Sequence, residues 1–120
     1  NLAVNARDAM PAGGVLTIST RTEHLDYATS PARPAGDRVI VEVRDTGVGM
    51  TPEIQAHIFD PYFTTKEPGL GTGLGLPTCH KIVEQHRGEI TCESTPGRGT
   101  CFRVALPASA APTAPPAATP

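Results

Sequence analysis

A run of alternating glycines from Gly69 to Gly75 indicates a site for an anion. Glycines allow consecutive backbone N–H groups to point at one anion, and the N-terminus of a following helix favours negative charge. The spacing is not that of G-x-x-x-x-G-K-S/T, and G-x-G-x-x-G fails because Leu74 and Leu76 occupy the third-glycine positions. The run therefore predicts a phosphate-binding loop of another kind, with a flexible structural hinge as the alternative. Its candidate contacts are Gly71, Thr72, Gly73, Leu74 and Gly75.

An asparagine near the start of the chain is a candidate metal ligand. Residues 1–10 are predicted to be the end of a helix, with Leu2, Ala6 and Ala9 on one face and Asn1, Asn5 and Asp8 on the adjacent face. A neutral amide oxygen can enter the octahedral oxygen shell of Mg²⁺ while phosphates supply the negative charge. We therefore expect Asn5 to be a magnesium ligand, the alternative being an ordinary solvated side chain.

A strand predicted over residues 39–45 ends in an acidic residue. Val39, Val41 and Val43 share one face, and the period of two places Asp45 on that same face. An acid that points into a buried layer is costly unless it has a partner. Gly47 follows in Asp-Thr-Gly-Val-Gly and, with Gly49, is expected to leave space for a flat base against the backbone. An ordinary Asp-x-Gly turn is the alternative.

The remaining elements would position these residues. A strand is expected over 15–20 with Leu16 and Ile18 facing the core, followed by a polar loop over about 26–37. A helix is expected from the cap Thr51 to about residue 59, and another from Pro77 to about Gly88. The last pair of strands forms a hairpin across residues 95–99, with inward positions Ile90, Cys92, Phe102, Val104 and Leu106.

Composition limits the protein to one domain with an aliphatic core. The chain has 120 residues, is 38% hydrophobic and contains no Trp. Its net charge of −2 gives no support to nucleic-acid binding. No apolar run approaches the roughly 18 residues that a membrane span needs, and no signal peptide is visible, so we expect a cytoplasmic domain. The three cysteines show no C-x-x-C pair and are expected to be free.

Four segments occur in a fixed order: NLAVNARDAM from Asn1, DTGVGM from Asp45, IFDPYFTTK from Ile58, and GLGTGLGL from Gly69. Together they resemble the catalytic, ATP-binding domain of bacterial sensor histidine kinases. The resemblance covers residues 1–107, and residues 108–120 form a Pro/Ala-rich linker. It implies an α+β fold, a two-layer α/β sandwich in which helices cover one face of a mixed sheet. The chain would be an N-terminally truncated form of that domain.

The resemblance also assigns roles to single residues. It implies that Asn5 binds Mg²⁺, that Asp45 accepts a hydrogen bond from the adenine amine, and that Thr100 lies near the adenine. Lys66, or alternatively Arg7, would supply positive charge to the phosphates. Aromatic residues that resemble the family's phenylalanine-rich box would anchor a lid over the ATP; these are Phe59, Tyr62 and Phe63.

The function implied is transfer of the ATP γ-phosphoryl group to a histidine in an upstream dimerisation and phosphoacceptor domain of the same protein. A response-regulator receiver domain would be a partner, and the full-length protein, expected to be a homodimer, could be membrane-anchored. None of the four histidines of the chain has an acceptor context; they are His24, His57, His80 and His86. A non-catalytic ATP-binding module and a hydrolysing ATPase of the gyrase or chaperone type are the alternatives. Asn1 disfavours the last, because such ATPases resemble one another in placing a glutamate base there.

Overall fold

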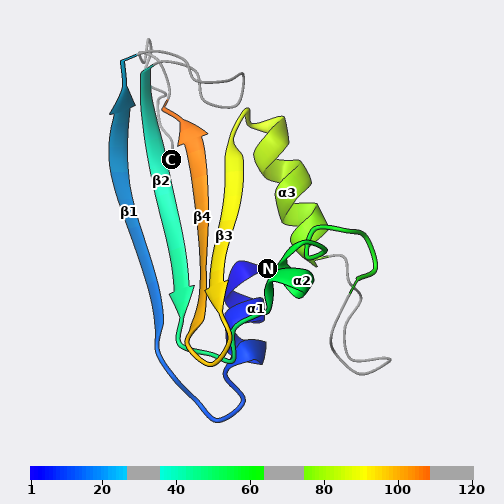
Figure 1. The fold of residues 1–120 in the computed structure, drawn as a ribbon. Helices are drawn as coiled ribbons and strands as arrows, with labels where there is room; N and C mark the ends of the chain where they lie inside the picture. Colours follow the sequence, from blue (N-terminus) through cyan, green and yellow to red (C-terminus); the bar gives the residue numbers. More distant parts are fainter. Residues whose placement is uncertain (27–35, 64–74, 109–120) are drawn as a thin grey trace, which may run out of the picture.

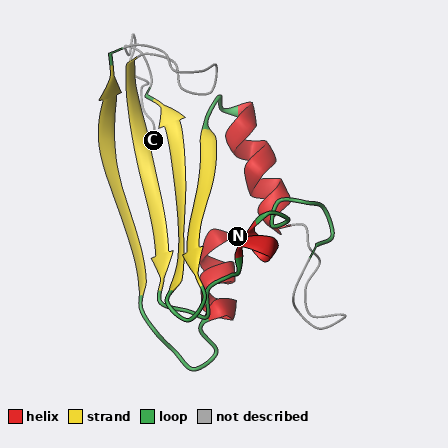
Figure 2. Ribbon diagram, in the orientation of Figure 1, coloured by secondary structure: helices red, strands yellow, loops and turns green. Residues whose placement is uncertain are grey.

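The computed structural model describes residues 1–26, 36–63 and 75–108, which form a sheet with helices on one of its faces (Figure 1). The helices lie together on one side, and the strands run side by side (Figure 2). In chain order the elements are α1 (Leu2–Ala9), β1 (Leu16–Leu25), β2 (Gly36–Asp45), α2 (Pro52–Gln55), α3 (Gly75–Gln85), β3 (Glu89–Thr95) and β4 (Gly99–Pro107). The expected α+β, two-layer arrangement is confirmed.

The sheet has the strand order β1-β2-β4-β3, and every pairing between described strands is antiparallel. A mixed sheet was expected from the family resemblance, and the helical connection from β2 to β3 is a crossover of the kind that joins parallel strands. β3 does run parallel to β2, but β4 lies between them and is antiparallel to both. The crossover therefore creates no parallel pairing within the described residues.

Local sequence accounts for where the short helix α2 begins and ends. The Thr51 hydroxyl accepts a hydrogen bond from the backbone N–H of Ile54 at 3.3 Å, and Pro52 occupies the first turn. The predicted helix over 51–59 is too long. Beyond Gln55 the chain continues in tighter turns, in which His57 N–H donates to Ile54 at 3.0 Å and Asp60 N–H donates to His57 at 2.9 Å.

The core lies between the sheet and the helices. Its buried members are Ile58, Val83, Ile90, Phe102 and Val104. The inward faces predicted for both strands of the β3–β4 hairpin are thereby confirmed. α1 contributes Ala6, which is 2% exposed, and Leu2, which packs against the same cluster. The described part of the chain holds no helix of the length and apolar character that crossing a bilayer requires.

Leu16 and Ile18 were predicted to face the core; they lie on that face of the sheet but are not buried. Leu16 and Ile18 are 40% and 59% exposed, although they share the face of the sheet that carries the core. The reason is the strand order: β1 is an edge strand, and the buried core cluster draws its described strand residues from β3 and β4 (Figure 1). Periodicity identified the correct face, but the helices do not extend over that edge.

The opposite face of the sheet is held by ion pairs. Glu42 is central, accepting hydrogen bonds from Arg21 at 2.7 Å and from Arg103 at 2.9 Å. Arg103 also donates to Glu93 at 3.2 Å. The bond from Arg21, followed by that from Arg103, holds the pKa of Glu42 below its ordinary value. This face also carries the buried residues Ile40, Cys101 and Ala105, and two nitrogens of the buried Arg38 side chain, Nε and Nη1, have no hydrogen-bond partner among the described residues.

At the end of α3, Arg87 has a strained backbone conformation and Gly88 lies close against strand β4. The N–H of Gly88 donates to Val83 at 2.9 Å and that of Arg87 to Glu84 at 2.9 Å, the pattern of a helix terminated by a left-handed residue. That residue is Arg87, with φ of +60°. A Cβ on Gly88 would lie 2.5 Å from the carbonyl oxygen of Ala105. Both positions therefore favour glycine, position 87 because of its backbone angle and position 88 because of its close approach to β4.

We expect Arg87→Gly to raise the free energy of unfolding by about 1 kcal/mol, because glycine adopts a left-handed conformation without strain. Gly88→Ala should lower it by about 1–3 kcal/mol, because the added methyl group must displace strand β4. Chemical denaturation of both variants beside the parent measures the two effects. Equal effects of the same sign would show that the geometry of this helix end is different.

Candidate functional site

Asp45, the last residue of β2, is a buried carboxylate with one oxygen occupied by the protein. Its exposed fraction is 6%. Oδ1 accepts the backbone N–H of Gly47 at 2.8 Å and that of Thr100 at 3.3 Å. Within the described residues Oδ2 receives no hydrogen bond. The inward direction predicted from strand periodicity is confirmed, and the geometry leaves one acceptor oxygen of a fixed carboxylate free to take a ligand's hydrogen bond.

The glycines that follow Asp45 are required by close packing. A Cβ on Gly47 would meet the backbone carbonyl of Ala9 and its Cβ, the latter at 2.8 Å. The Val48 N–H donates to the same Ala9 carbonyl at 2.9 Å. Gly49 has φ of +71°, and a Cβ there would lie 2.6 Å from the carbonyl carbon of Thr95. Protein backbone thus lies where side chains would be, and the expected contact of these glycines with a base stays a prediction.

Thr100 lies directly opposite Asp45 in the register of β2 and β4 and is 6% exposed. Its Oγ1 is 2.7 Å from Oγ of Ser94, which is paired with it across β3 and β4. The Ser94 hydroxyl also accepts the Met50 N–H at 2.8 Å. The sequence analysis missed Ser94. Its spacing of two from the inward positions Ile90 and Cys92 could have identified it as a polar residue on an apolar face.

Asn5 lies on α1, one turn after Asn1, the residue that lies beside the start of α3. It is half-buried, its backbone N–H donates to the Asn1 carbonyl at 3.0 Å, and its side-chain amide makes no hydrogen bond to described residues. A Cβ on Gly75 would be 3.6 Å from the side-chain oxygen of Asn1. The N-terminus of α1 is therefore beside the N-terminus of α3, where an anion would be favoured.

Helix α1 thus connects two groups of candidate residues. Its last residue, Ala9, touches Gly47 beside Asp45, and its cap, Asn1, lies beside Gly75. Eight helical residues span about 12 Å. Other candidates fall outside the described residues and are not placed; they are Lys66, Gly71, Thr72, Gly73 and Leu74. The alternative cation, Arg7, forms an exposed ion pair with Asp8 at 3.2 Å.

The aromatic residues of the predicted box occupy different environments. Phe59 packs on the core cluster, and its ring centroid is 5.0 Å from that of His80 on α3. Phe63 lies 5.6 Å from His57 by the same measure. Tyr62 is 74% exposed and has φ of +68°. Phe59 therefore anchors the chain leaving α2, and the residues predicted to form a lid lie outside the described part of the chain.

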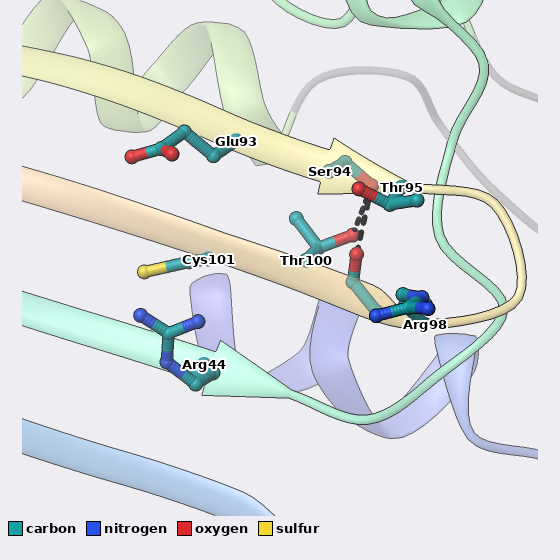
Figure 3. Close-up of a pocket in the computed structure, with 8 residues that line it drawn as sticks. Arg44, Glu93, Ser94, Thr95, Arg98, Thr100 and Cys101 are labelled. Atoms are coloured by element: carbon teal, nitrogen blue, oxygen red, sulfur yellow. Dashed lines mark hydrogen bonds between the residues drawn. The ribbon is translucent and has the colours of Figure 1, made fainter.

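A shallow pocket of about 250 Å³ lies at the turn end of β3 and β4 (Figure 3). Its lining residues are Arg44, Glu93, Ser94, Thr95, Arg98, Gly99, Thr100 and Cys101. Arg44 and Cys101 alternate with Asp45 and Thr100 along their strands, so they belong to the charged face of the sheet. The pocket shares Thr100 and its hydrogen-bonded neighbour with the candidate site, but neither Asn5 nor Asp45 lines it.

The cysteines are free, as expected, and two are poor nucleophiles. Cys79, Cys92 and Cys101 form no disulfide. Burial raises the pKa of Cys92 to about 12, and burial also raises the pKa of Cys101. Within the described ranges no group of three or more His, Cys, Asp or Glu side chains could hold a metal ion.

The chain is similar to one protein family and to several curated proteins. The family described as histidine kinase-, DNA gyrase B-, and HSP90-like ATPase matches residues 1–110. Sensor kinase CckA of Brucella abortus is 50% identical over 110 residues, which cover 89% of this chain and 12% of CckA. Sporulation kinase C of Bacillus subtilis is 44% identical over 107 residues, which cover 89% of this chain and 22% of that kinase. The chain thus spans a small part of these curated relatives.

Solved structures show the same fold. The catalytic domain of histidine kinase ThkA superposes with a TM-score of 0.67 at 32% identity, covering 88% of this chain and 61% of that domain. Full-length ShkA in complex with AMPPNP gives a TM-score of 0.63 at 29% identity, covering 88% of this chain and 19% of ShkA. With the family match over residues 1–110, these similarities show that the chain belongs to the histidine kinase-, DNA gyrase B-, and HSP90-like ATPase family.

Proposed function

We propose that this chain is the ATP-binding catalytic part of a two-component sensor histidine kinase. It would donate the ATP γ-phosphoryl group to a histidine in an upstream dimerisation and phosphoacceptor domain of the same protein. The observation that carries the proposal is the buried carboxylate of Asp45, which has one oxygen fixed by the backbone and one available. The relatives named as sensor and sporulation kinases support the reaction class, and the AMPPNP complex of ShkA supports the nucleotide.

Asp45 would select adenine by charge and hydrogen bonding. With Oδ1 held by two backbone N–H groups, Oδ2 can accept a hydrogen bond from the exocyclic amine of adenine. A hydrogen bond to a charged acceptor contributes about 1.5–3 kcal/mol. A base that presents a carbonyl oxygen there would instead place two acceptors against each other, which disfavours guanine.

Asn5 fits a role as one ligand of Mg²⁺. Its amide is half-buried, has no hydrogen-bond partner among the described residues, and supplies the neutral oxygen that this ion accepts. The charge neutralisation required for phosphoryl transfer would come from bound Mg²⁺. The N-terminus of α3 at Gly75 would face the phosphates, together with Gly71, Thr72, Gly73 and Leu74. We keep Lys66 as the preferred cation for the phosphates and Arg7 as its substitute.

Asn1 supports transfer to an external nucleophile over hydrolysis of ATP. It lies one turn before Asn5 on α1, at the position where the sequence resemblance places a glutamate base in hydrolysing ATPases. A side-chain amide has no basic site to take a proton from water. The segment would therefore position ATP without activating water, while the accepting histidine would come from the upstream domain.

The wider assignment follows from the same proposal. Residues 1–107 would be the catalytic domain and residues 108–120 a linker. A response-regulator receiver domain would take the phosphoryl group onward, the full-length protein would be a homodimer, and the catalytic part would work in the cytoplasm. No role in nucleic-acid binding is proposed, because the net charge is −2.

The first prediction for the site concerns adenine. Asp45→Asn is expected to weaken ATP binding about tenfold or more. The two N–H donors hold the amide oxygen at the Oδ1 position, so the NH₂ group must face the adenine amine, donor against donor. Titration with a fluorescent ATP analogue measures the effect, with Asp37→Asn, an exposed site at the other end of β2, as the matched control. An affinity within about twofold of the parent would exclude the role of Asp45.

A second prediction concerns the metal. Asn5→Ala should abolish most of the gain in ATP affinity that Mg²⁺ provides, while leaving the fold intact because alanine is a better helix former. Nucleotide titrations with and without Mg²⁺ measure that gain directly. Gln85→Ala, which removes an exposed amide from α3, should keep the full gain. If the gain in Asn5→Ala equals that of the parent, Asn5 is not a ligand.

A third prediction tests the reaction. Incubated with radiolabelled ATP and Mg²⁺, the 120-residue chain should form no acid-labile phosphohistidine, and a longer form containing the upstream acceptor helices should form it. The histidines of the chain are engaged in other contacts, such as that of His57 Nδ1 with Asp60 at 2.8 Å and of His24 Nδ1 with Asp37 at 2.7 Å. Labelling of a histidine within the short chain would overturn the assignment. ATP hydrolysis by the longer form without phosphohistidine would favour a hydrolysing ATPase.

A further inference from the structure

The hydroxyl of Ser94 is the centre of a small hydrogen-bond network at the end of β3. It accepts the Met50 N–H at 2.8 Å and donates to the Gly99 carbonyl at 3.1 Å. It is also 2.7 Å from the Thr100 hydroxyl (Figure 3). Gln55 lies beside it, donating from Nε2 to the carbonyls of Ser94 at 3.2 Å and Met50 at 3.3 Å. Ser94 therefore joins the sheet to the chain that enters α2.

Three polar residues form one row across the sheet. Asp45 pairs with Thr100 in the β2–β4 register, and Thr100 pairs with Ser94 in the β4–β3 register. All three lie on the face that carries the core, at the end nearest the β3–β4 turn. The backbone N–H of Thr100 reaches Asp45, and its hydroxyl reaches Ser94. A base held by Asp45 would thus lie beside a threonine hydroxyl whose orientation depends on Ser94.

The direction of the Ser94 hydroxyl determines whether the Thr100 hydroxyl can donate a hydrogen bond. A hydroxyl has one proton to donate and two lone pairs, and the Met50 N–H uses one lone pair of Ser94. If Ser94 donates to Gly99, the proton of Thr100 is used on Ser94, and Thr100 offers only lone pairs. If Ser94 donates to Thr100, the proton of Thr100 is free for a ring nitrogen of the base. Ser94 can therefore determine whether Thr100 presents a donor or an acceptor.

We propose that Ser94 is a positioning residue for the nucleobase, acting through Thr100. The proposal rests on the proposed ATP site and names a residue that determines its specificity. When adenine is bound, Ser94 donates to Thr100, and Thr100 donates to a ring nitrogen while Asp45 accepts from the exocyclic amine. Ser94 itself does not contact the ligand.

A double-mutant cycle on the full chain separates positioning from a merely structural role. We expect Ser94→Ala and Thr100→Val each to weaken ATP binding about tenfold. The double variant should bind no more weakly than Thr100→Val alone, because Ser94 then has no hydroxyl to orient. Thr91→Val, which removes a hydroxyl from the charged face of β3, is the matched control and should leave the affinity unchanged. Additive losses in the double variant would overturn the proposal.

A second readout uses purine riboside triphosphate, which lacks the exocyclic amine but keeps the ring nitrogens. Ser94→Ala should weaken its binding as much as that of ATP, whereas Asp45→Asn should no longer matter. If Ser94→Ala fails to fold in thermal unfolding, Ser94→Cys replaces it, since a thiol of similar shape is a weaker donor. Loss for Asp45→Asn but none for the Ser94 variant removes the positioning role alone. No loss of ATP binding for Asp45→Asn removes the adenine site.

Discussion

The buried carboxylate of Asp45 imposes the strictest condition on this structure. A charge that is 6% exposed is tolerated only where hydrogen bonds replace those lost from water. The two that Oδ1 receives come from Gly47 in the turn after β2 and from Thr100 in the neighbouring strand. Both are available only if β4 lies beside β2 in this register and the chain turns back at once after Asp45. The strand order, which brings Thr100 beside Asp45, and the turn that contains Gly47 therefore supply the hydrogen bonds of the same carboxylate.

Helix α1 connects the surroundings of Asp45 to the start of α3. The Ala9 carbonyl, at one end, accepts the Val48 N–H and lies against Gly47, so the helix is fixed to the turn after β2. At the other end, Asn1 lies beside Gly75, where α3 begins. The helix that carries the candidate metal ligand is thus held at both ends by the segments proposed to bind the base and the phosphates. Its orientation follows from backbone contacts that side-chain periodicity does not describe.

The sequence predicted what depends on local periodicity and missed what depends on neighbours. The period of two correctly placed Asp45 on the inward face, and the apolar stripes identified the strands of the closing hairpin. The same rule placed Leu16 on the correct face but could not show that the helices end before the edge strand. Ser94 was missed because its partners are defined by strand register and by a loop 44 residues away. The sequence identified Gly47 as a site residue but did not predict that it packs against Ala9 of α1.

The ion pairs on the outer face of the sheet also affect how residues on the inner face are aligned. Side chains alternate between the two faces of a strand, so a shift of β4 by one residue against its neighbours would exchange its faces. Arg103 would then turn into the apolar layer, and Glu42 and Glu93 would lose the hydrogen bonds that Arg103 donates to them, while Thr100 would turn away from Asp45. The charged ladder opposes that slip at a distance from the ligand. These ion pairs therefore help to fix the register of β4. Charged residues on the face away from the proposed nucleotide site thus keep Asp45, Thr100 and Ser94 aligned with one another.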